Sequence, residues 1–147
     1  MSQETAGPLR SLGLRPTVPQ SLPTVGVLLG DIAVVFAFIA AGMYSHNEPV
    51  WEYPAYAVDV ATPFVVTWLL VAGVGGLYHR STVGSLRRTA LLTSAAWTVA
   101  ALLGSGLRAT AFFPGDAPLT FVAVQVAIGM AFVLPWRLAT AWLFRRA

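Results

Sequence analysis

The chain contains no cysteine, which excludes disulfides, thiolate metal sites and thiol nucleophiles. It contains no lysine either, so its nine basic residues are all arginines. Charged residues make up only 10% of the sequence, whereas a soluble domain carries roughly 25%. Because 56% of the residues are hydrophobic, the shortage of charge indicates a chain whose main solvent is lipid.

The motifs of soluble enzymes are also missing. The sequence holds no phosphate loop, no HExxH, no GxSxG and no spacing typical of a metal site. We therefore expect no metal and no cofactor. The net charge of +3 does not indicate nucleic acid, because the arginines gather at the ends of apolar runs, where topology and anionic headgroups explain them. The lipid bilayer is the expected partner.

Four long apolar segments are present instead, at residues 24–44, 56–77, 89–112 and 119–144. Each is close to the roughly 20 residues that cross about 30 Å of hydrocarbon as a helix. Lipid offers no partner to an open backbone group, so each segment is predicted to be helical. The sequence thus predicts an all-α integral membrane four-helix bundle, and its short loops favour up-down-up-down order. Pro63 and Pro135 fall inside two segments and are expected to kink them.

The N-terminal region differs from the rest of the chain. Residues 1–22 contain Pro8, Pro16 and Pro19 and show neither a period of 2 nor one of 3.6. They are predicted to form a disordered cytoplasmic tail. Residues 23–147 then make up one transmembrane domain.

The arginines predict the orientation of this domain. The tail, the middle loop and the C-terminus carry arginines, whereas the loop 45–55 carries Glu48, Glu52 and no arginine. Because basic loops stay in the cytoplasm, both termini and the middle loop are predicted to be cytoplasmic. The expected location is the plasma membrane, as a multi-pass protein.

Asp31 is the first candidate for a functional residue. It lies about seven residues, or roughly 10 Å, into the first segment. Ionisable groups inside a bilayer are costly and suggest a function. Asp31 is interpreted either as a proton acceptor or ion ligand, or as one half of a structural pair with Arg137 or a middle-loop arginine reaching inward. The second interpretation is favoured, because a carboxylate at this shallow depth can find a partner.

A second group of polar residues lies toward the opposite face. Asp59 and Arg108 have matching depths. They are expected to pair across helices, or else Asp59 caps or charges a helix N-terminus, which the helix dipole favours. His46 is either a solvated loop residue or a member of this layer. Gln125 is expected to hydrogen-bond between helices as a structural contact.

Several short motifs together resemble a known family. They are "GD…VFAFIAAG…SH" in the first segment, "ATPFVVTW" in the second, an arginine late in the third, and "FVAV" followed by "PWR" in the fourth. The set resembles a family of small four-span membrane proteins of archaea and bacteria known only as a domain of unknown function, over about residues 28–140. The resemblance implies no substrate or mechanism. It does imply that one recurring pattern joins Asp31, His46, Pro63, Phe64, Arg108, Trp136 and Arg137.

Three kinds of function remain open. The favoured one is a structural or accessory membrane subunit, because the loops are short and no deep array of charges exists. The alternative is a transporter or conduit for protons or a small solute that uses the intramembrane Asp and Arg residues. A membrane enzyme acting on a lipid-soluble substrate ranks last, because no nucleophile and base are paired. A GxxxG pair, Gly26 and Gly30, is compatible with a homo-oligomer or a larger membrane complex.

Overall fold

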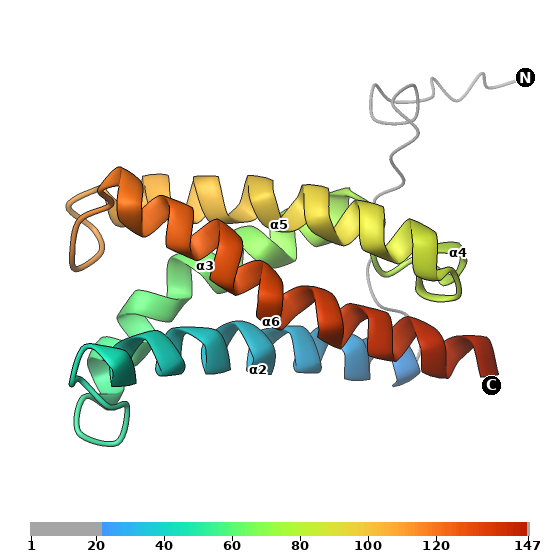
Figure 1. Cartoon of the computed structure of the whole chain (residues 1–147), viewed down its shortest axis with the longest axis horizontal. Coiled ribbons are helices and arrows are strands. Elements are labelled where there is room, and N and C mark those ends of the chain that lie inside the picture. The colour runs from blue at the N-terminus through green and yellow to red at the C-terminus, as the bar shows by residue number, and fades with distance from the viewer. Residues whose placement is uncertain (1–21, 147) are drawn as a thin grey trace, which may run out of the picture.

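The computed structural model describes residues 22–146. Its elements are four long helices and one short helix: α2 (Leu22–Ser45), α3 (Pro54–Val74), α4 (Arg80–Val83), α5 (Leu86–Arg108) and α6 (Leu119–Arg146). No strand occurs in this range and the long helices pack together (Figure 1), so the predicted all-α four-helix bundle is confirmed. The expected tail lies outside the described residues, apart from Leu22 at the start of α2.

The long helices alternate in direction and form a ring. α5 packs against α3 and α6, and α2 packs against the same two helices. Each long helix therefore has two neighbours, and successive helices run in opposite directions, as Figure 1 shows. One end of the bundle holds the connection 75–85, and the other holds the connections 46–53 and 109–118. We name these the Arg137 end and the Arg108 end, after the buried arginine near each.

All four long helices have the length and apolar composition needed to cross a membrane. Their outward faces carry large apolar side chains that are exposed, among them Leu29, Leu70, Leu91 and Ile128. An apolar exterior of this kind is stable in contact with hydrocarbon and not with water. The chain therefore has the character of a multi-pass membrane protein.

Two helices end earlier than the sequence analysis predicted. α3 stops at Val74 because Gly75 and Gly76 follow, and Gly76 has a φ of 74°, a left-handed conformation that glycine adopts without steric cost. α5 stops at Arg108, and Phe113 and Pro114 follow in the loop. The chain stays non-helical until Leu119, and the residues before Pro114 and Pro118 in this loop are biased away from the helical conformation.

Aromatic side chains fill the middle of the bundle. The Trp97 ring lies 5.8 Å from the Trp68 ring and 6.2 Å from the Phe38 ring, between centroids. The facing helix makes room through Gly129, where an added Cβ would come within 2.2 Å of the Trp97 ring. The Trp97 indole N–H donates to the Gln125 backbone carbonyl at 3.1 Å. The centre of the bundle is therefore a packed core and not a channel.

The two prolines inside the helices do not interrupt them. Pro63 is buried within α3, and α6 continues through Pro135 to Arg146. Near Pro63, the Thr67 hydroxyl lies 2.7 Å from the Pro63 carbonyl and 2.9 Å from the Ala100 carbonyl on α5. This contact ties α3 to α5 where the proline removes a backbone donor. The kinks expected at Pro63 and Pro135 stay predictions.

Candidate functional site

A buried charged cluster lies at the Arg137 end and is centred on Asp31 of α2. Arg137 Nη2, from α6, lies 2.6 Å from Asp31 Oδ2. The Tyr78 hydroxyl donates to the same oxygen at 2.6 Å, and the Trp136 indole N–H donates to Oδ1 at 2.9 Å. Asp31 and Arg137 are each only 1% exposed. The expected pair between Asp31 and Arg137 therefore forms, and both carboxylate oxygens are occupied.

Gly30 positions Trp136 in this cluster. A Cβ at Gly30 would come within 1.9 Å of Trp136 Cζ2, so the indole lies directly on the backbone of α2. This close approach lets the Trp136 N–H reach the adjacent Asp31. The other member of the GxxxG pair, Gly26, has nothing within 4 Å of an added Cβ. Gly30 thus serves a contact within the chain, which the sequence motif did not reveal.

The turn after α3 delivers two further groups to the cluster. The left-handed Gly76 is followed by Leu77 and Tyr78, which are both buried. The Leu77 carbonyl accepts from Arg137 Nη1 at 3.2 Å, and Tyr78 donates to Asp31. Burial, with the Asp31 carboxylate beside it, raises the pKa of Tyr78. The phenol therefore stays protonated and keeps its role as a donor.

Hydrogen bonds from α4 and from the first turn of α5 hold this turn in place. The Thr82 hydroxyl donates to the Gly76 carbonyl at 3.1 Å, and the Thr89 hydroxyl donates to the Thr82 carbonyl at 2.7 Å. α5 begins here with Ser85 as its N-cap, whose hydroxyl accepts from the Arg88 backbone N–H. The middle loop is therefore an ordered part of the cluster.

Arg137 is enclosed by aromatic rings as well as by oxygens. Its guanidinium carbon lies 4.8 Å from the Tyr78 ring centroid and 5.5 Å from that of Trp68. Contacts of this type stabilise a desolvated cation. Arg137 Nε makes no hydrogen bond. The cluster links α2, α6 and the turn after α3, and it engages both carboxylate oxygens of Asp31.

The Arg108 end has a buried arginine without an acid. Arg108 is 8% exposed, and its Nε donates to the Asp116 backbone carbonyl at 3.2 Å. The Phe121 ring lies 4.8 Å from the guanidinium carbon. Within residues 22–146, no carboxylate forms an ion pair with Arg108, and its Nη1 is buried without any hydrogen-bond partner.

A small cavity of about 130 Å³ adjoins this arginine. Its polar lining residues are His46, Glu48, Tyr56, Arg108 and Gln125, and the remainder of its wall is apolar. Gln125 is buried, and its Oε1 has no hydrogen-bond partner. All four long helices contribute to the wall, so the cavity lies between them at this end of the bundle.

The polar layer expected toward this face forms only in part. His46 is exposed and shares the cavity wall with Arg108 and Gln125. Asp59 is also exposed, but it makes no ion pair with Arg108 and it is not the cap of α3, which is Tyr53. Of the two interpretations of Asp59, the pair with Arg108 is therefore wrong, and Asp59 does not lie in the first turn of α3 either. The Gln125 side chain makes no bond between helices, and only its backbone carbonyl does so.

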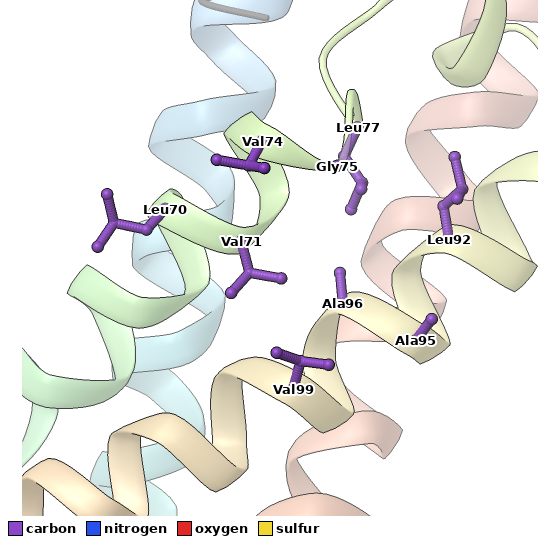
Figure 2. Close-up of a pocket in the computed structure, with 9 residues that line it drawn as sticks. All are labelled: Leu70, Val71, Val74, Gly75, Leu77, Leu92, Ala95, Ala96 and Val99. Atoms are coloured by element: carbon purple, nitrogen blue, oxygen red, sulfur yellow. The ribbon is translucent and has the colours of Figure 1, made fainter. Parts of the chain in front are cut away.

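A larger apolar groove of about 400 Å³ lies between α3 and α5. Figure 2 shows its nine lining residues, and the side chains drawn there contain only carbon. They are Leu70, Val71, Val74, Gly75, Leu77, Leu92, Ala95, Ala96 and Val99. Such a wall can solvate hydrocarbon but offers no charge or donor. The chemically distinctive sites are therefore the two arginine clusters.

Several residues of these clusters did not stand out in the sequence. Tyr78 resembled an ordinary loop tyrosine, and Gly115, whose φ is 98°, resembled an ordinary turn glycine. An added Cβ at Gly115 would lie 2.3 Å from Arg108 Nη2. The one signal in the sequence was a glycine in the loop that directly follows Arg108.

In the described part of the chain, no group of three His, Asp or Glu residues could hold a metal ion.

The chain was compared with protein families, curated proteins and solved structures. Residues 28–140 match the family described as "Protein of unknown function (DUF3054)". The match covers most of the chain and both arginine clusters, so the chain belongs to this family and the suspected resemblance is confirmed. No curated protein and no solved structure matches the chain.

Proposed function

We propose that this protein is a structural or accessory subunit of the plasma membrane, in which the Asp31–Arg137 cluster holds the helices together. The observation that carries the proposal is that both carboxylate oxygens of Asp31 are engaged by groups of the same chain. Both carboxylate oxygens accept hydrogen bonds, and the three donors are Arg137, Tyr78 and Trp136. A carboxylate that relays protons needs an open oxygen and access to water, and Asp31 is almost completely buried.

The interior between the two ends supports the same proposal. Trp68, Trp97 and Phe38 fill it with ring contacts. A proton path or solute path along the bundle would need polar groups or water in this region. Besides the Trp97 N–H, which is bonded to a backbone carbonyl, the packed region offers isolated polar atoms such as Trp68 Nε1 and Thr93 Oγ1. A structural role therefore fits the described residues better than transport through a single chain.

The proposal includes an orientation. The connection 75–85 carries Arg80, and α6 ends with Arg145 and Arg146, all near the Arg137 end. Basic segments favour the cytoplasmic side, so we place the Arg137 end and both termini there. A reporter that is active only in the cytoplasm, fused after Ala147, is expected to be active. The same reporter inserted at Asn47 is expected to be silent, and the reverse pattern would refute the orientation.

The experiment on function compares Asp31→Asn with Asp59→Asn in the full chain. Asp31→Asn removes the buried partner of Arg137, whereas Asp59→Asn removes an exposed acid from the neighbouring helix as a matched control. We expect Asp31→Asn alone to lower the thermal stability in a neutral detergent. Wild-type proteoliposomes are expected to show no proton flux above empty vesicles. Flux that Asp31→Asn abolishes without a loss of stability would refute the structural role.

The accessory part of the proposal has its own test. A subunit of a larger assembly should elute after mild solubilisation at a size above that of one chain, with a second component or further copies in fixed proportion. Elution as a single chain from native membranes would restrict the role to a self-contained bundle and would reject the accessory assignment.

A further inference from the structure

Arg108 is held in a fixed position by groups that do not neutralise it. The loop 109–118 folds over the guanidinium, with the Asp116 carbonyl on Nε and the Gly115 backbone against Nη2. The Asp116 carboxylate is directed elsewhere, because its Oδ1 accepts from the Ala117 backbone N–H at 2.8 Å. On another side the Phe121 ring faces the cation. These contacts orient Arg108 without supplying a negative charge.

Two buried polar atoms next to this clamp lack partners. They are Arg108 Nη1 and Gln125 Oε1, and both residues line the cavity at the Arg108 end. A buried cation with an unused donor is costly unless a partner completes it. The Gln125 amide can rotate to present Nε2, so it can supply a second donor beside the guanidinium.

We propose that this cavity binds an oxyanion, a carboxylate or a phosphate group, between Arg108 and Gln125. Guanidinium groups bind these anions through charge-assisted hydrogen bonds. The cavity volume of about 130 Å³ corresponds to roughly four waters. That space suits a headgroup and not a whole lipid chain. Apolar wall residues such as Phe38, Met43 and Val124 can contact the first carbons of an attached tail.

One acidic side chain lines the cavity in which we propose that the anion binds. Glu48, in the connection 46–53, lines the same cavity and is exposed. It repels an anion at Arg108 without pairing with the arginine itself. His46 and Tyr56 are the other titratable groups in the wall. Glu48 should therefore weaken binding, and its neutralisation should strengthen it.

The experiment measures thermal unfolding of the full chain in a neutral detergent at neutral pH. The probes are octanoate, inorganic phosphate and micelles doped with phosphatidylglycerol, and octanol serves as the uncharged match for octanoate. Near saturation, a binding anion is expected to raise Tm by about 2–4 °C. A response to inorganic phosphate identifies a free anion as the source. A response confined to octanoate and the anionic lipid identifies a membrane amphiphile.

Three variants and one control locate the site. Arg108→Gln should abolish the shift, while Arg88→Gln, which removes an exposed arginine at the other end of α5, should keep it. Gln125→Leu should lower the affinity about tenfold, the loss expected for a hydrogen bond to a charged group. Its backbone carbonyl still accepts from Trp97, so the fold is retained. Glu48→Gln should raise the affinity up to about fivefold.

The outcomes decide the proposal even if Arg108→Gln does not fold. Opposite changes in affinity for Gln125→Leu and Glu48→Gln support the site. An octanol response equal to that of octanoate, the absence of any anion response, or a shift that neither Gln125→Leu nor Glu48→Gln alters would overturn it.

Discussion

The two ends of the bundle treat a buried arginine in opposite ways. At the Arg137 end, the guanidinium meets a carboxylate that is only 1% exposed and that two further donors also contact. At the Arg108 end, the guanidinium meets a backbone carbonyl and an aromatic ring, and Nη1 stays unpaired. Each guanidinium thus keeps one buried nitrogen without a hydrogen-bond partner, Nε in Arg137 and Nη1 in Arg108. The difference is that, within residues 22–146, the chain supplies a counter-charge to Arg137 and none to Arg108.

This difference shows why a buried charge alone does not identify a functional site. Both arginines lie in a bundle whose exterior is apolar, and both are more than nine-tenths buried. What separates them is whether the chain supplies the counter-charge. A complete pair connects helices, and an incomplete one is open to a ligand.

The largest expected effect comes from breaking the complete pair. Arg137→Leu leaves the Asp31 carboxylate buried without its cation, which is expected to cost about 3–5 kcal/mol of unfolding free energy. Adding Asp31→Asn to Arg137→Leu should recover part of this loss, because no charge is then stranded. Thermal unfolding of the single and double variants checks this. If the double variant loses as much unfolding free energy as the two single variants together, the two residues are not coupled.

A smaller effect is expected from the glycine that admits Trp136. Gly30→Ala places a Cβ where the structure has the Trp136 ring, so the indole must move away from Asp31. Overpacking of this kind typically costs about 1–3 kcal/mol. The matched control is Gly26→Ala, one turn earlier on α2, where nothing lies within 4 Å of the added Cβ. Equal Tm values for the two variants would contradict the close contact.

Gly115→Ala tests the clamp at the other end. It places a methyl group against the Arg108 guanidinium at a backbone φ of 98°, which non-glycine residues rarely adopt. We expect a loss of about 1–2 kcal/mol and a weaker response to octanoate. Gly106→Ala, also near the end of α5, has open space around its Cβ and should change neither property. An unaltered anion response in Gly115→Ala would show that the clamp does not position Arg108.

An effect similar in size to that of Gly115→Ala at neutral pH, but dependent on pH, is expected from the Tyr78 phenol. Because the folded protein raises its pKa above the ordinary value of about 10, the stability that it contributes is complete below pH ~10 and falls as the pH rises further. The expected slope is about 1.4 kcal/mol per pH unit above that point. Tyr78→Phe should lose about 1.5 kcal/mol at neutral pH, the low end for a hydrogen bond to a charged group, and should lack this slope. Denaturation measured at several alkaline pH values compares the two proteins, and identical pH dependence would contradict the buried phenol.

Much of the fold could be predicted because depth in a membrane follows directly from sequence position. Four apolar runs of the right length predict four helices, and the depths of Asp31 and Arg137 made their pairing a reasonable expectation. The direction in which a side chain points around its helix axis is harder to predict, because it depends on how the helices pack. Asp59 and Arg108 share a depth, yet Asp59 is exposed while Arg108 is buried. Matching depth therefore could not establish that they pair.

The remaining parts of the two clusters depend on loop geometry. Tyr78 reaches Asp31 because Gly76 turns left-handed after α3, and Arg108 is covered because Gly115 does so after α5. Apolar periodicity contains no information about these turns. Gly30 shows a related limit, since a small residue on a helix can serve a neighbouring helix of the same chain as readily as a second copy.

One side-by-side measurement tests the central claim that only one of the two arginines is neutralised within the chain. Arg137→Gln and Arg108→Gln remove the same charge by the same substitution, and their thermal unfolding can be followed in one neutral detergent. We expect Arg137→Gln to lose several kcal/mol, because it strands Asp31. Arg108→Gln, which leaves no carboxylate behind, is expected to lose about 1 kcal/mol or less. Equal losses, or a larger loss for Arg108→Gln, would contradict the account.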